Sequence, residues 1–246
     1  MPMDAIKFKE LDYIRGDYIP SHEHEEGQVL FARSGTMEVT ADSHFVCVPA
    51  SRIVWVPPKV DHSIRFRTDT KMRTAFIKPD LLDNTYKHIC VHQATGLFRE
   101  ILLRLVENNL HDQDYKDLLE LSLIKEMCSL KDEPFSIKFP QDIRAKRVAD
   151  ALLVDPSNTA KINEWAELAA CSSKTLSRLF IKETELTFQL WRRHLRLLLI
   201  HDLLDMGSSV TEAAHAVGFA TSSALTEAHK KTFGYPPTRL FDRVDK

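Results

Sequence analysis

The sequence predicts an α+β protein of two parts: an N-terminal antiparallel β-barrel with two helices, and a C-terminal all-α domain. Three observations predict this architecture. Short β-branched and aromatic runs recur about every ten residues between residues 6 and 77. Two helix-turn-helix patterns follow near the C-terminus, and a long Leu- and Arg-rich helix lies between them. With 246 residues, the chain is long enough for two domains with separate cores.

Six runs in the N-terminal part are predicted to be strands, because apolar residues alternate within them and turn residues separate them. The runs are GQVLFARSG, TMEVTA, HFVCVPA, RIVWVPP, HSIRFRT and MRTAFIK. This pattern is typical of an antiparallel barrel or sandwich. Two helices are expected next, at about residues 95–109 and 114–131.

The apolar residues of these two helices recur at helical spacing and predict a packing face. They are Leu97, Phe98, Ile101, Leu105, Leu118, Leu121, Ile124 and Cys128. Such a face must be buried on the barrel, on the other helix or on a second subunit. We expect it to form a homodimer; the alternative is packing within one chain.

The segment LKDEPFSIKFPQD contains two prolines and no helical period, so it is predicted to be a linker. The expected organisation is an effector-binding and dimerisation domain at residues 1–130, a linker at 131–141 and a helical domain at 142–246. The first helix of that last domain should run from about residue 142 to 153, with the segment DPSNT closing it.

The first helix-turn-helix is predicted at about residues 162–183. Its first helix should bury Trp165, Ala166, Leu168 and Ala169. Ala170–Cys171 stands at the corner, and Ser172 is a suitable cap for the second helix. That helix should turn Leu176, Leu179 and Phe180 inward.

The second helix-turn-helix is predicted at about residues 209–232. Ser209 and Glu212 have the spacing of a capping box, and Gly218 allows a sharp corner. Thr221 caps the next helix. The apolar residues expected to face inward are Ala213, Ala214, Val217, Ala224, Leu225 and Ala228.

A single helix is predicted between the two units, from about residue 188 to 206, with Gly207 as a left-handed stop. At 1.5 Å per residue it would be about 28 Å long, close to the ~34 Å of one DNA turn. Arg192, Arg193 and Arg196 on this helix are candidates for phosphate contacts.

The last hundred or so residues resemble the DNA-binding domain of the AraC/XylS family of transcriptional regulators. The resemblance rests on LAACSSKTLSRLF, WRRHLRLLL, VTEAAHAVGFATSSAL and KKTFGYPP, across about residues 143–239. It implies that the second helix of each unit reads base edges in consecutive major-groove segments of an operator or promoter. The matching positions are Ser173, Lys174, Ser177, Arg178, Ser222, Ser223, Thr226 and Glu227. RNA polymerase is a further expected partner.

This chain departs from the family pattern at three places. Glu185 stands where the family usually has the Gly that ends the first recognition helix. Ala224–Leu225 and His229 replace larger aromatic side chains in the second unit. Glu227 is acidic, so it is suited to accept a hydrogen bond from a cytosine amino group and not to bind phosphate.

His22-x-His24-x3-Gln28-x6-Gly35 resembles the first motif of the cupin superfamily, and His62 falls where its second motif supplies another histidine. Alternation along one strand would place His22 and His24 on one face. The resemblance implies a divalent metal site, although Gln28 replaces the usual carboxylate with a neutral ligand. The alternatives are a metal-free effector pocket or structural histidines, so no cofactor is required.

Composition is consistent with a cytoplasmic, nucleoid-associated regulator. The chain has net charge −2; residues 141–246 carry +2 and residues 1–140 carry −4. Four separated cysteines predict buried reduced thiols. No signal peptide or membrane span is predicted. A cupin-type metalloenzyme with an appended helical domain, or a ligand sensor acting on proteins alone, are the alternatives to a non-enzymatic regulator.

Overall fold

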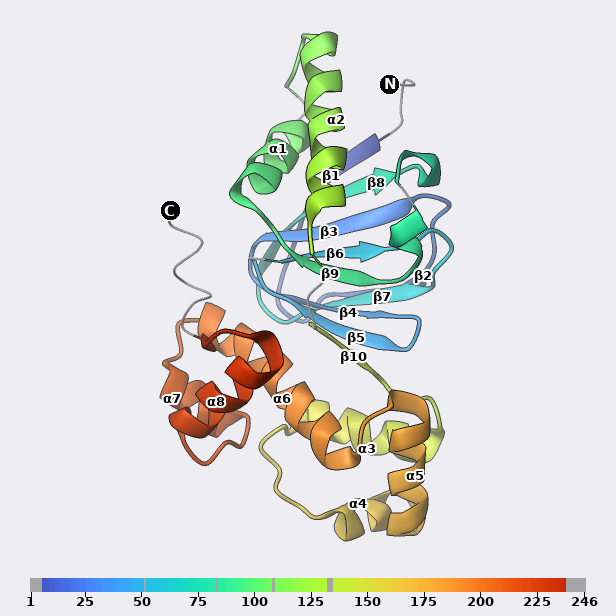
Figure 1. The fold of residues 1–246 in the computed structure, drawn as a ribbon, viewed down its shortest axis with the longest axis vertical. Coiled ribbons are helices and arrows are strands. Elements are labelled where there is room, and N and C mark those ends of the chain that lie inside the picture. The colour runs from blue at the N-terminus through green and yellow to red at the C-terminus, as the bar shows by residue number, and fades with distance from the viewer. Residues whose placement is uncertain (1–5, 51, 83, 108, 132–134, 238–246) are drawn as a thin grey trace. The chain divides into compact units, whose positions relative to one another are not determined.

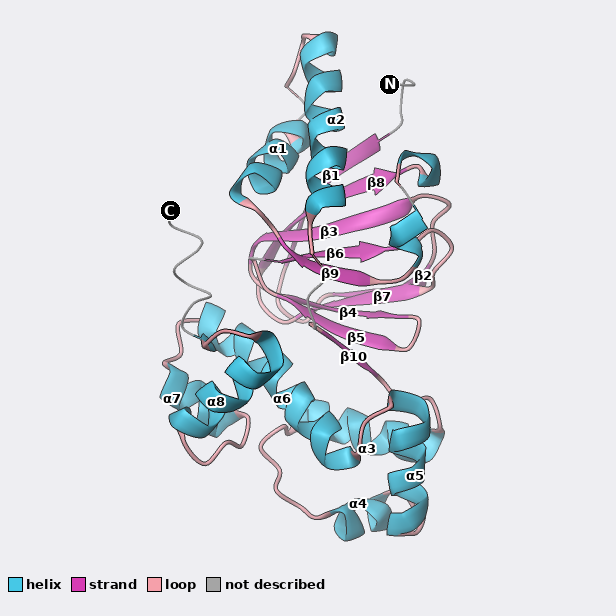
Figure 2. Ribbon diagram, in the orientation of Figure 1, coloured by secondary structure: helices cyan, strands magenta, loops and turns pink. Residues whose placement is uncertain are grey.

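The structure is a computed structural model that describes residues 6–50, 52–82, 84–107, 109–131 and 135–237 (Figure 1). Its internal contacts divide the chain into two units. The N-terminal unit comprises residues 1–42 and 48–133, and the C-terminal unit comprises residues 43–47 and 134–242. Strands dominate the first unit and helices the second (Figure 2). This division agrees with the predicted α+β class.

The N-terminal unit contains a five-stranded antiparallel sheet in the order β1-β8-β3-β6-β9. Its strands are β1 (Ile6–Tyr13), β3 (Gly27–Ser34), β6 (Arg52–Val56), β8 (Thr70–Ile77) and β9 (Cys90–Gln93). Three strands of a second sheet follow in the order β4-β7-β2. They are β2 (Tyr18–His22), β4 (Met37–Ala41) and β7 (His62–Phe66).

The predicted strands are therefore confirmed, but they form two sheets and not one closed barrel. Strand spacing fixes where strands lie along the chain and leaves their pairing open. Two strands that the runs did not single out, β1 and β9, form the two edges of the first sheet.

The first sheet has one face toward two helices and one face away from them. Val29 pairs with Trp55, and both pack in a core cluster with helical residues such as Phe98 and Leu123. Gln28 pairs with Val56 one position earlier. Because successive side chains of a strand point to opposite faces, Gln28 lies on the face turned away from that core.

The two helices are α1 (Gly96–Val106) and α2 (Gln113–Ser129), connected to the sheet by two 3₁₀ turns (Pro79–Leu81 and Asn84–Lys87) and β9. Thr95 caps α1 by accepting a hydrogen bond from the Phe98 N–H at 3.0 Å. Asp112 accepts from the Tyr115 N–H at 3.1 Å and caps α2. Both predicted helices are confirmed.

Within one chain, part of the predicted packing face of these helices is buried and part is exposed. Phe98, Ile101, Leu105 and Ile124 are buried as expected, whereas Leu97, Leu118, Leu121 and Cys128 are exposed. In α2 the buried positions are instead Leu123 and Met127, next to Ile124. Apolar residues occur on several sides of α2, so periodicity alone does not select the face that packs.

In its described residues, the C-terminal unit contains a strand pair and six helices. Strand β5 (His44–Val48) pairs antiparallel with β10 (Ser136–Lys138). The helices are α3 (Ile143–Val154), α4 (Ile162–Leu168), α5 (Ser173–Thr184), α6 (Phe188–Asp205), α7 (Val210–Ala216) and α8 (Ser222–Phe233). The segment predicted to be a linker thus contains β10; residues 132–134 of that segment lie outside the described residues.

Helix α6 agrees with the single helix predicted between the two units. Thr187 caps its start, and Gly207 follows its end with φ of +87°, in the left-handed region. The buried Trp191 indole donates to the Lys138 carbonyl at 2.8 Å and packs against the Phe139 ring. These contacts attach β10 to the N-terminal half of α6.

The departures from the family pattern are accommodated locally. Glu185 ends α5 in the left-handed conformation, with φ of +62°, and its carboxylate pairs with Lys138. The cost of a non-glycine residue there is about 1 kcal/mol. His229 is fully buried, and its Nδ1 donates to the Tyr235 carbonyl at 2.6 Å. Its ring packs against Phe233, so the histidine fills the site of a larger aromatic residue.

The four cysteines are thiols, but they are not uniformly buried as predicted. Cys47 is buried and its thiol donates to the Asp202 carboxylate at 2.8 Å, whereas Cys128 is exposed on α2. Among the described residues, no helix has the length and apolar character needed to span a bilayer.

Candidate functional site

Helices α4 and α5 form the first helix-turn-helix. Trp165, Ala166 and Ala169 are buried as predicted, whereas Leu168 is 45% exposed. The corner is made by Ala170, whose φ of +50° is unusual for a residue with a Cβ. Ser172 then caps α5 by accepting from the Thr175 N–H at 3.1 Å.

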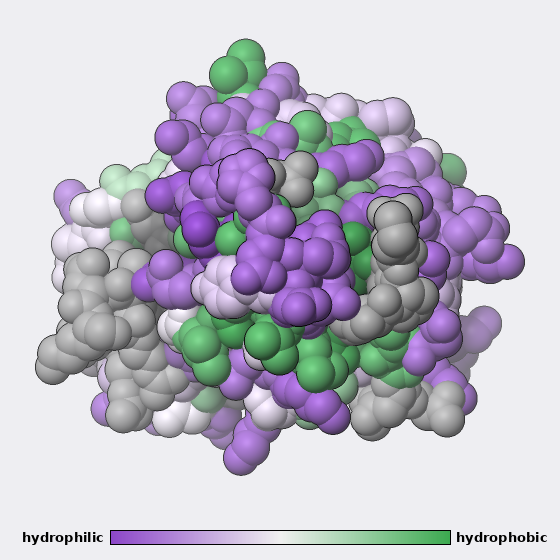
Figure 3. Space-filling model, turned by 90° about the horizontal axis from the view of Figure 1, so that it is seen from above, coloured by the Kyte–Doolittle hydropathy of each residue, from purple (hydrophilic) through white to green (hydrophobic). Residues whose placement is uncertain are grey.

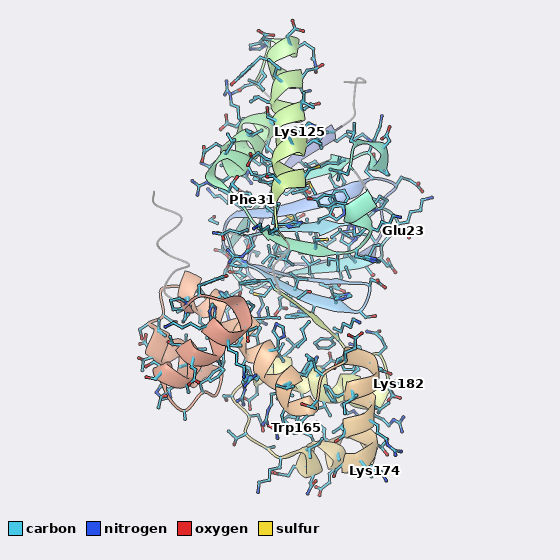
Figure 4. All side chains as sticks on the ribbon, viewed as in Figure 1. Glu23, Phe31, Lys125, Trp165, Lys174 and Lys182 are labelled. Carbon is cyan, nitrogen blue, oxygen red and sulfur yellow. The ribbon has the colours of Figure 1, made fainter. Side chains whose placement is uncertain are left out.

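The predicted reading residues of α5 lie on its solvent side. Lys174 and Arg178 are exposed, and neither forms an ion pair with the described residues. Ser173 and Ser177 are partly exposed, and the Ser173 hydroxyl donates to the Asn163 side chain at 2.7 Å. Figure 4 labels Lys174, which lies at the start of this helix. The four side chains are thus displayed together.

Helices α7 and α8 form the second helix-turn-helix. The capping box is present: the Ser209 N–H donates to Glu212 at 2.8 Å, and the Glu212 N–H donates back to Ser209 at 3.2 Å. Thr221 caps α8. Gly218 forms the corner with φ of +85°, and a Cβ there would lie 2.8 Å from the backbone of Ser157. Glycine is therefore required at this corner.

On α8, Ser223 and Glu227 are exposed and Ser222 and Thr226 are partly exposed, as the reading role requires. One expected inward residue, Ala224, is exposed instead. The buried positions on this helix are Leu225 and His229. Since Leu225 and His229 are four residues apart, they define the packing face, and Ala224 lies beside it on the open side.

The Arg196 side chain, on α6, connects the two helix-turn-helix units. Its guanidinium donates to four backbone carbonyls: Pro156 at 2.7 Å, Asn158 at 2.8 Å, Gly218 at 3.1 Å and Ser157 at 3.4 Å. Pro156–Asn158 belongs to the loop before α4, and Gly218 is the corner of the second unit. Arg196 therefore ties both units to the helix that carries them and is not available for phosphate.

The other two arginines of α6 differ from one another. The Arg192 guanidinium donates to the Ala160 carbonyl at 2.8 Å and lies over the Phe188 ring. Burial lowers the pKa of Arg192 and of Arg196, although both remain charged. Arg193 makes no hydrogen bond or ion pair to the described residues, so it is the freer phosphate candidate.

A second candidate site lies in the N-terminal unit, where His22, His24 and His62 come together. One ring nitrogen of each lies within 4.8 Å of those of the other two. His22 ends β2 and His62 begins β7, which pairs with it. His24 lies beyond the end of β2, so the expectation that one strand carries both His22 and His24 is wrong. The chain turn still brings the His24 ring beside the others.

Hydrogen bonds fix which nitrogens of this cluster carry lone pairs. Nδ1 of His22 lies 2.8 Å from the Pro20 carbonyl, and Nδ1 of His62 lies 2.9 Å from the Val60 carbonyl. A carbonyl only accepts, so Nδ1 of His22 carries the proton and its Nε2 carries a lone pair, whereas His62 has a carbonyl oxygen beside each of its ring nitrogens. Nε2 of His24 is buried with no hydrogen-bond partner among the described residues. Such carbonyl-oriented imidazoles are characteristic of metal ligands.

Gln28 turns its side-chain oxygen toward the same cluster. Its amide nitrogen donates to the Thr74 hydroxyl at 3.0 Å, and that hydroxyl donates to the Val29 carbonyl at 2.8 Å. The amide oxygen then lies 3.0 Å from Nε2 of His62. Nε2 of His62 can donate to this oxygen, or the two atoms can both face a cation.

The imidazoles of His24 and His62 favour the neutral form, as metal ligands must. Burial lowers the pKa of His62 to about 4, and it also lowers the pKa of His24. The residues therefore fit a divalent ion well, since they offer three imidazoles and one amide oxygen. Imidazole ligands suit Zn²⁺, Fe²⁺, Ni²⁺ or Cu²⁺.

The structure brings the three histidines and Gln28 together, adds two residues that the sequence pattern did not reveal, and gives Arg196 a different role from the predicted one. Asn163 holds Ser173, Thr74 orients Gln28, and Arg196 serves as a clamp where a phosphate contact was expected. A threonine within an apolar strand and an arginine among leucines are weak signals, because their partners lie far away in the sequence.

Comparisons with known proteins agree with this description. Residues 165–243 match a family of helix-turn-helix domains. The HTH-type transcriptional regulator NimR of Escherichia coli (strain K12) is 25% identical over 228 residues, which cover 92% of this chain and 83% of that protein. RipA of Corynebacterium glutamicum, also an HTH-type transcriptional regulator, is 34% identical over 99 residues, covering 40% of this chain and 30% of RipA. Wild-type ToxT from Vibrio cholerae strain SCE256, crystallised with an unsaturated fatty acid, aligns with 98% of this chain and 96% of its own at 13% identity and a TM-score of 0.42.

Two capped helix-turn-helix units on one shared helix, together with these relatives, define a DNA-binding transcriptional regulator. Residues 165–243 match the helix-turn-helix domain family, in the part of the chain that resembles the AraC/XylS regulators, and the N-terminal unit consists of antiparallel sheets with two helices. The reading as a metalloenzyme with an appended helical domain is not favoured.

Replacing Arg196 tests its role as a clamp. Arg196→Lys leaves one charge but cannot reach four carbonyls, so we expect the free energy of unfolding of the C-terminal unit to fall by about 1.5–3 kcal/mol. Urea denaturation measures this change. Arg193→Lys, on the same helix, is the matched control and should change stability by less than about 0.5 kcal/mol. Equal losses in both variants contradict the clamp.

Proposed function

We propose that the chain reads an operator by placing α5 and α8 in consecutive major-groove segments on one side of the duplex. The observation that carries this proposal is the attachment of both units to α6 through Arg196. The 18 residues of α6 extend about 27 Å, and one DNA turn is about 34 Å. A rigid support of that length favours simultaneous reading of two adjacent segments.

The two recognition helices should contribute differently. The first displays Lys174 and Arg178, so it supplies electrostatic attraction to phosphate and guanine. The second displays Ser223 and Glu227 and supplies hydrogen bonding to bases, with Glu227 suited to a cytosine amino group. Because the C-terminal part has a net charge of only +2, specific contacts must carry much of the affinity.

The N-terminal unit is proposed to bind a small effector and to form a homodimer. Control by an effector requires that it bind DNA-competent and incompetent states with different affinity. RNA polymerase remains a predicted partner. The names of the curated relatives support regulation, so we propose that the chain has no catalytic role of its own.

An exposed apolar face on α1 and α2 supports the homodimer. Leu118 is 62% exposed, and Tyr115 and Leu121 are each 45% exposed at intervals of three residues along α2. Leu97 on α1 is 58% exposed. Seen from above, green apolar patches interrupt the hydrophilic surface (Figure 3). Several large apolar side chains on one helix pair are typical of an interaction surface.

We also propose a divalent metal at His22, His24 and His62, with the Gln28 oxygen beside them. Support comes from the orientation of the imidazoles by backbone carbonyls and from the partnerless Nε2 of His24. The metal would either stabilise the fold of the N-terminal unit or take part in binding the effector. A metal-free effector pocket at the same residues is the alternative.

Arg178→Ala tests the assignment of the reading residues. If Arg178 makes a bidentate guanine contact, specific binding should weaken by about 1–3 kcal/mol and base preference should relax at one position. Competition titrations with DNA fragments selected by the wild-type protein measure both effects. Lys182→Ala, an exposed residue at the far end of α5, should leave base preference unchanged. An unchanged preference for Arg178→Ala removes it from the reading set.

Charge on the apolar face tests the homodimer. Leu118→Glu and Leu121→Glu together should weaken self-association at least about tenfold, because each buried leucine contributes about 1.5–3 kcal/mol. Sedimentation equilibrium measures the change. Ile14→Glu alters another exposed apolar residue of the same unit and should leave association unchanged. A wild-type protein that is monomeric at micromolar concentration rejects this surface.

Cobalt titration tests the metal proposal. Wild-type protein should bind one Co²⁺ per chain, His62→Ala should lose this stoichiometric binding, and Gln28→Glu should tighten it by supplying a charged ligand. His111→Ala is the control, since His111 is exposed and outside the cluster. Absence of Co²⁺ and Zn²⁺ binding by the wild-type protein favours the metal-free alternative.

A further inference from the structure

The N-terminal unit contains a cavity of about 320 Å³ that is separate from the histidine site. It is lined by Trp55, Pro57, Pro58, Pro79, Leu82, Tyr86 and Lys87. Trp55 shares its sheet face with Val29, whereas Gln28 of the histidine site points to the other face. The cavity therefore lies on the side of the first sheet that carries α1 and α2, and the two sites are on opposite faces.

The aromatic walls of this cavity are held in fixed positions. The Trp55 indole donates to the Tyr86 carbonyl at 2.9 Å, and the two rings meet edge to face with centroids 5.6 Å apart. The indole also lies directly on Gly27, where an added Cβ would be 1.9 Å from the ring. The three prolines of the lining have no N–H to donate. A ligand thus meets two aromatic rings and three prolines whose positions are fixed.

Among the described residues that line the cavity, Lys87 is the charged one. Its side chain is exposed and forms no ion pair with the described side chains. An apolar chamber with one cation at its edge is complementary to an apolar molecule that carries one negative charge. The volume equals that of roughly ten water molecules at about 30 Å³ each, so the ligand must be small.

We propose that this cavity binds a small, flat, apolar anion, with its ring system between the aromatic and proline walls and its anionic group at Lys87. The proposal deepens the effector response proposed above and rests on it for its regulatory meaning. One wall is linked to α2, because the Tyr86 hydroxyl donates to the Met127 carbonyl. A ligand against Tyr86 therefore acts on the helix that carries the exposed apolar face.

Two isosteric probes test the chemistry: 2-naphthoate, which is anionic, and 2-naphthamide, which is neutral. In calorimetric titrations of the full chain without DNA, both should bind. The anion should bind more tightly by roughly two- to fivefold, the range for an exposed ion pair. Lys87→Gln should abolish this difference and leave the affinity for the amide unchanged. Lys78→Gln, a nearby lysine outside the lining, is the matched control and should preserve the difference.

A cavity-filling variant confirms the location. Leu82→Trp should block both probes while circular dichroism and the midpoint of thermal unfolding show a folded protein. Failure of both probes to bind the wild-type protein overturns the proposal, and so does binding that is unaffected by Leu82→Trp. An anion preference that persists in Lys87→Gln overturns the assignment of Lys87.

Operator titrations with and without 2-naphthoate separate this proposal from the effector response. If 2-naphthoate binds with the pattern expected for the Lys87 and Leu82 variants and also changes the affinity for the operator, both the cavity site and the effector response are supported. Binding with that pattern and an unchanged operator affinity supports the cavity as an anion site and rejects 2-naphthoate as an effector. If the wild-type protein binds no operator under any condition, the proposal that α5 and α8 read DNA is rejected. The calorimetric result for the cavity is unaffected.

Discussion

The C-terminal unit depends on one half-buried cationic group, the Arg196 guanidinium, and the backbone carbonyls around it. Helix α6 packs against α5, α7 and α8, and the Arg196 guanidinium on it reaches both the loop before α4 and the corner after α7. Gly218 makes this possible, because any Cβ there would collide with Ser157. Arginine suits the task, since its planar fork has five donors in fixed directions. The reading helices are thereby held by main-chain atoms, and their exposed side chains are free to vary with the DNA sequence.

The N-terminal unit uses the two faces of its first sheet for different chemistry. One face carries Gln28 toward the histidine cluster, where polar side chains are ordered by carbonyls and by Thr74. The other face carries Trp55 toward α1 and α2, beside a cavity with apolar walls. A single strand pair, β3 with β6, supplies residues to both. The loop after β6 joins them as well, because Pro57 and Pro58 line the cavity and the Lys59 N–H donates to the His24 carbonyl at 2.8 Å.

Burial explains why some residues with functional appearance are structural. His229 stands on a recognition helix but is enclosed by aromatic rings, and Arg192 bends back onto Ala160 and Phe188. Exposure identifies the opposite case. Leu118 and Leu121 have the composition of core residues and yet lie on the surface, which is the basis for assigning them to a subunit interface.

The sequence by itself determined the elements with strong local signals. The capping box at Ser209 and Glu212, the stop at Gly207 and the alternating runs of β3 to β8 depend on neighbours a few residues away, so they are readable along the chain. Only the tertiary structure decided the rest: the pairing of strands into two sheets, the side of α2 that packs, the turn after β2 that carries His24, and the clamp at Arg196. Each of these joins residues distant in sequence, and their choice among competing partners follows from burial and hydrogen-bond geometry that no local pattern encodes.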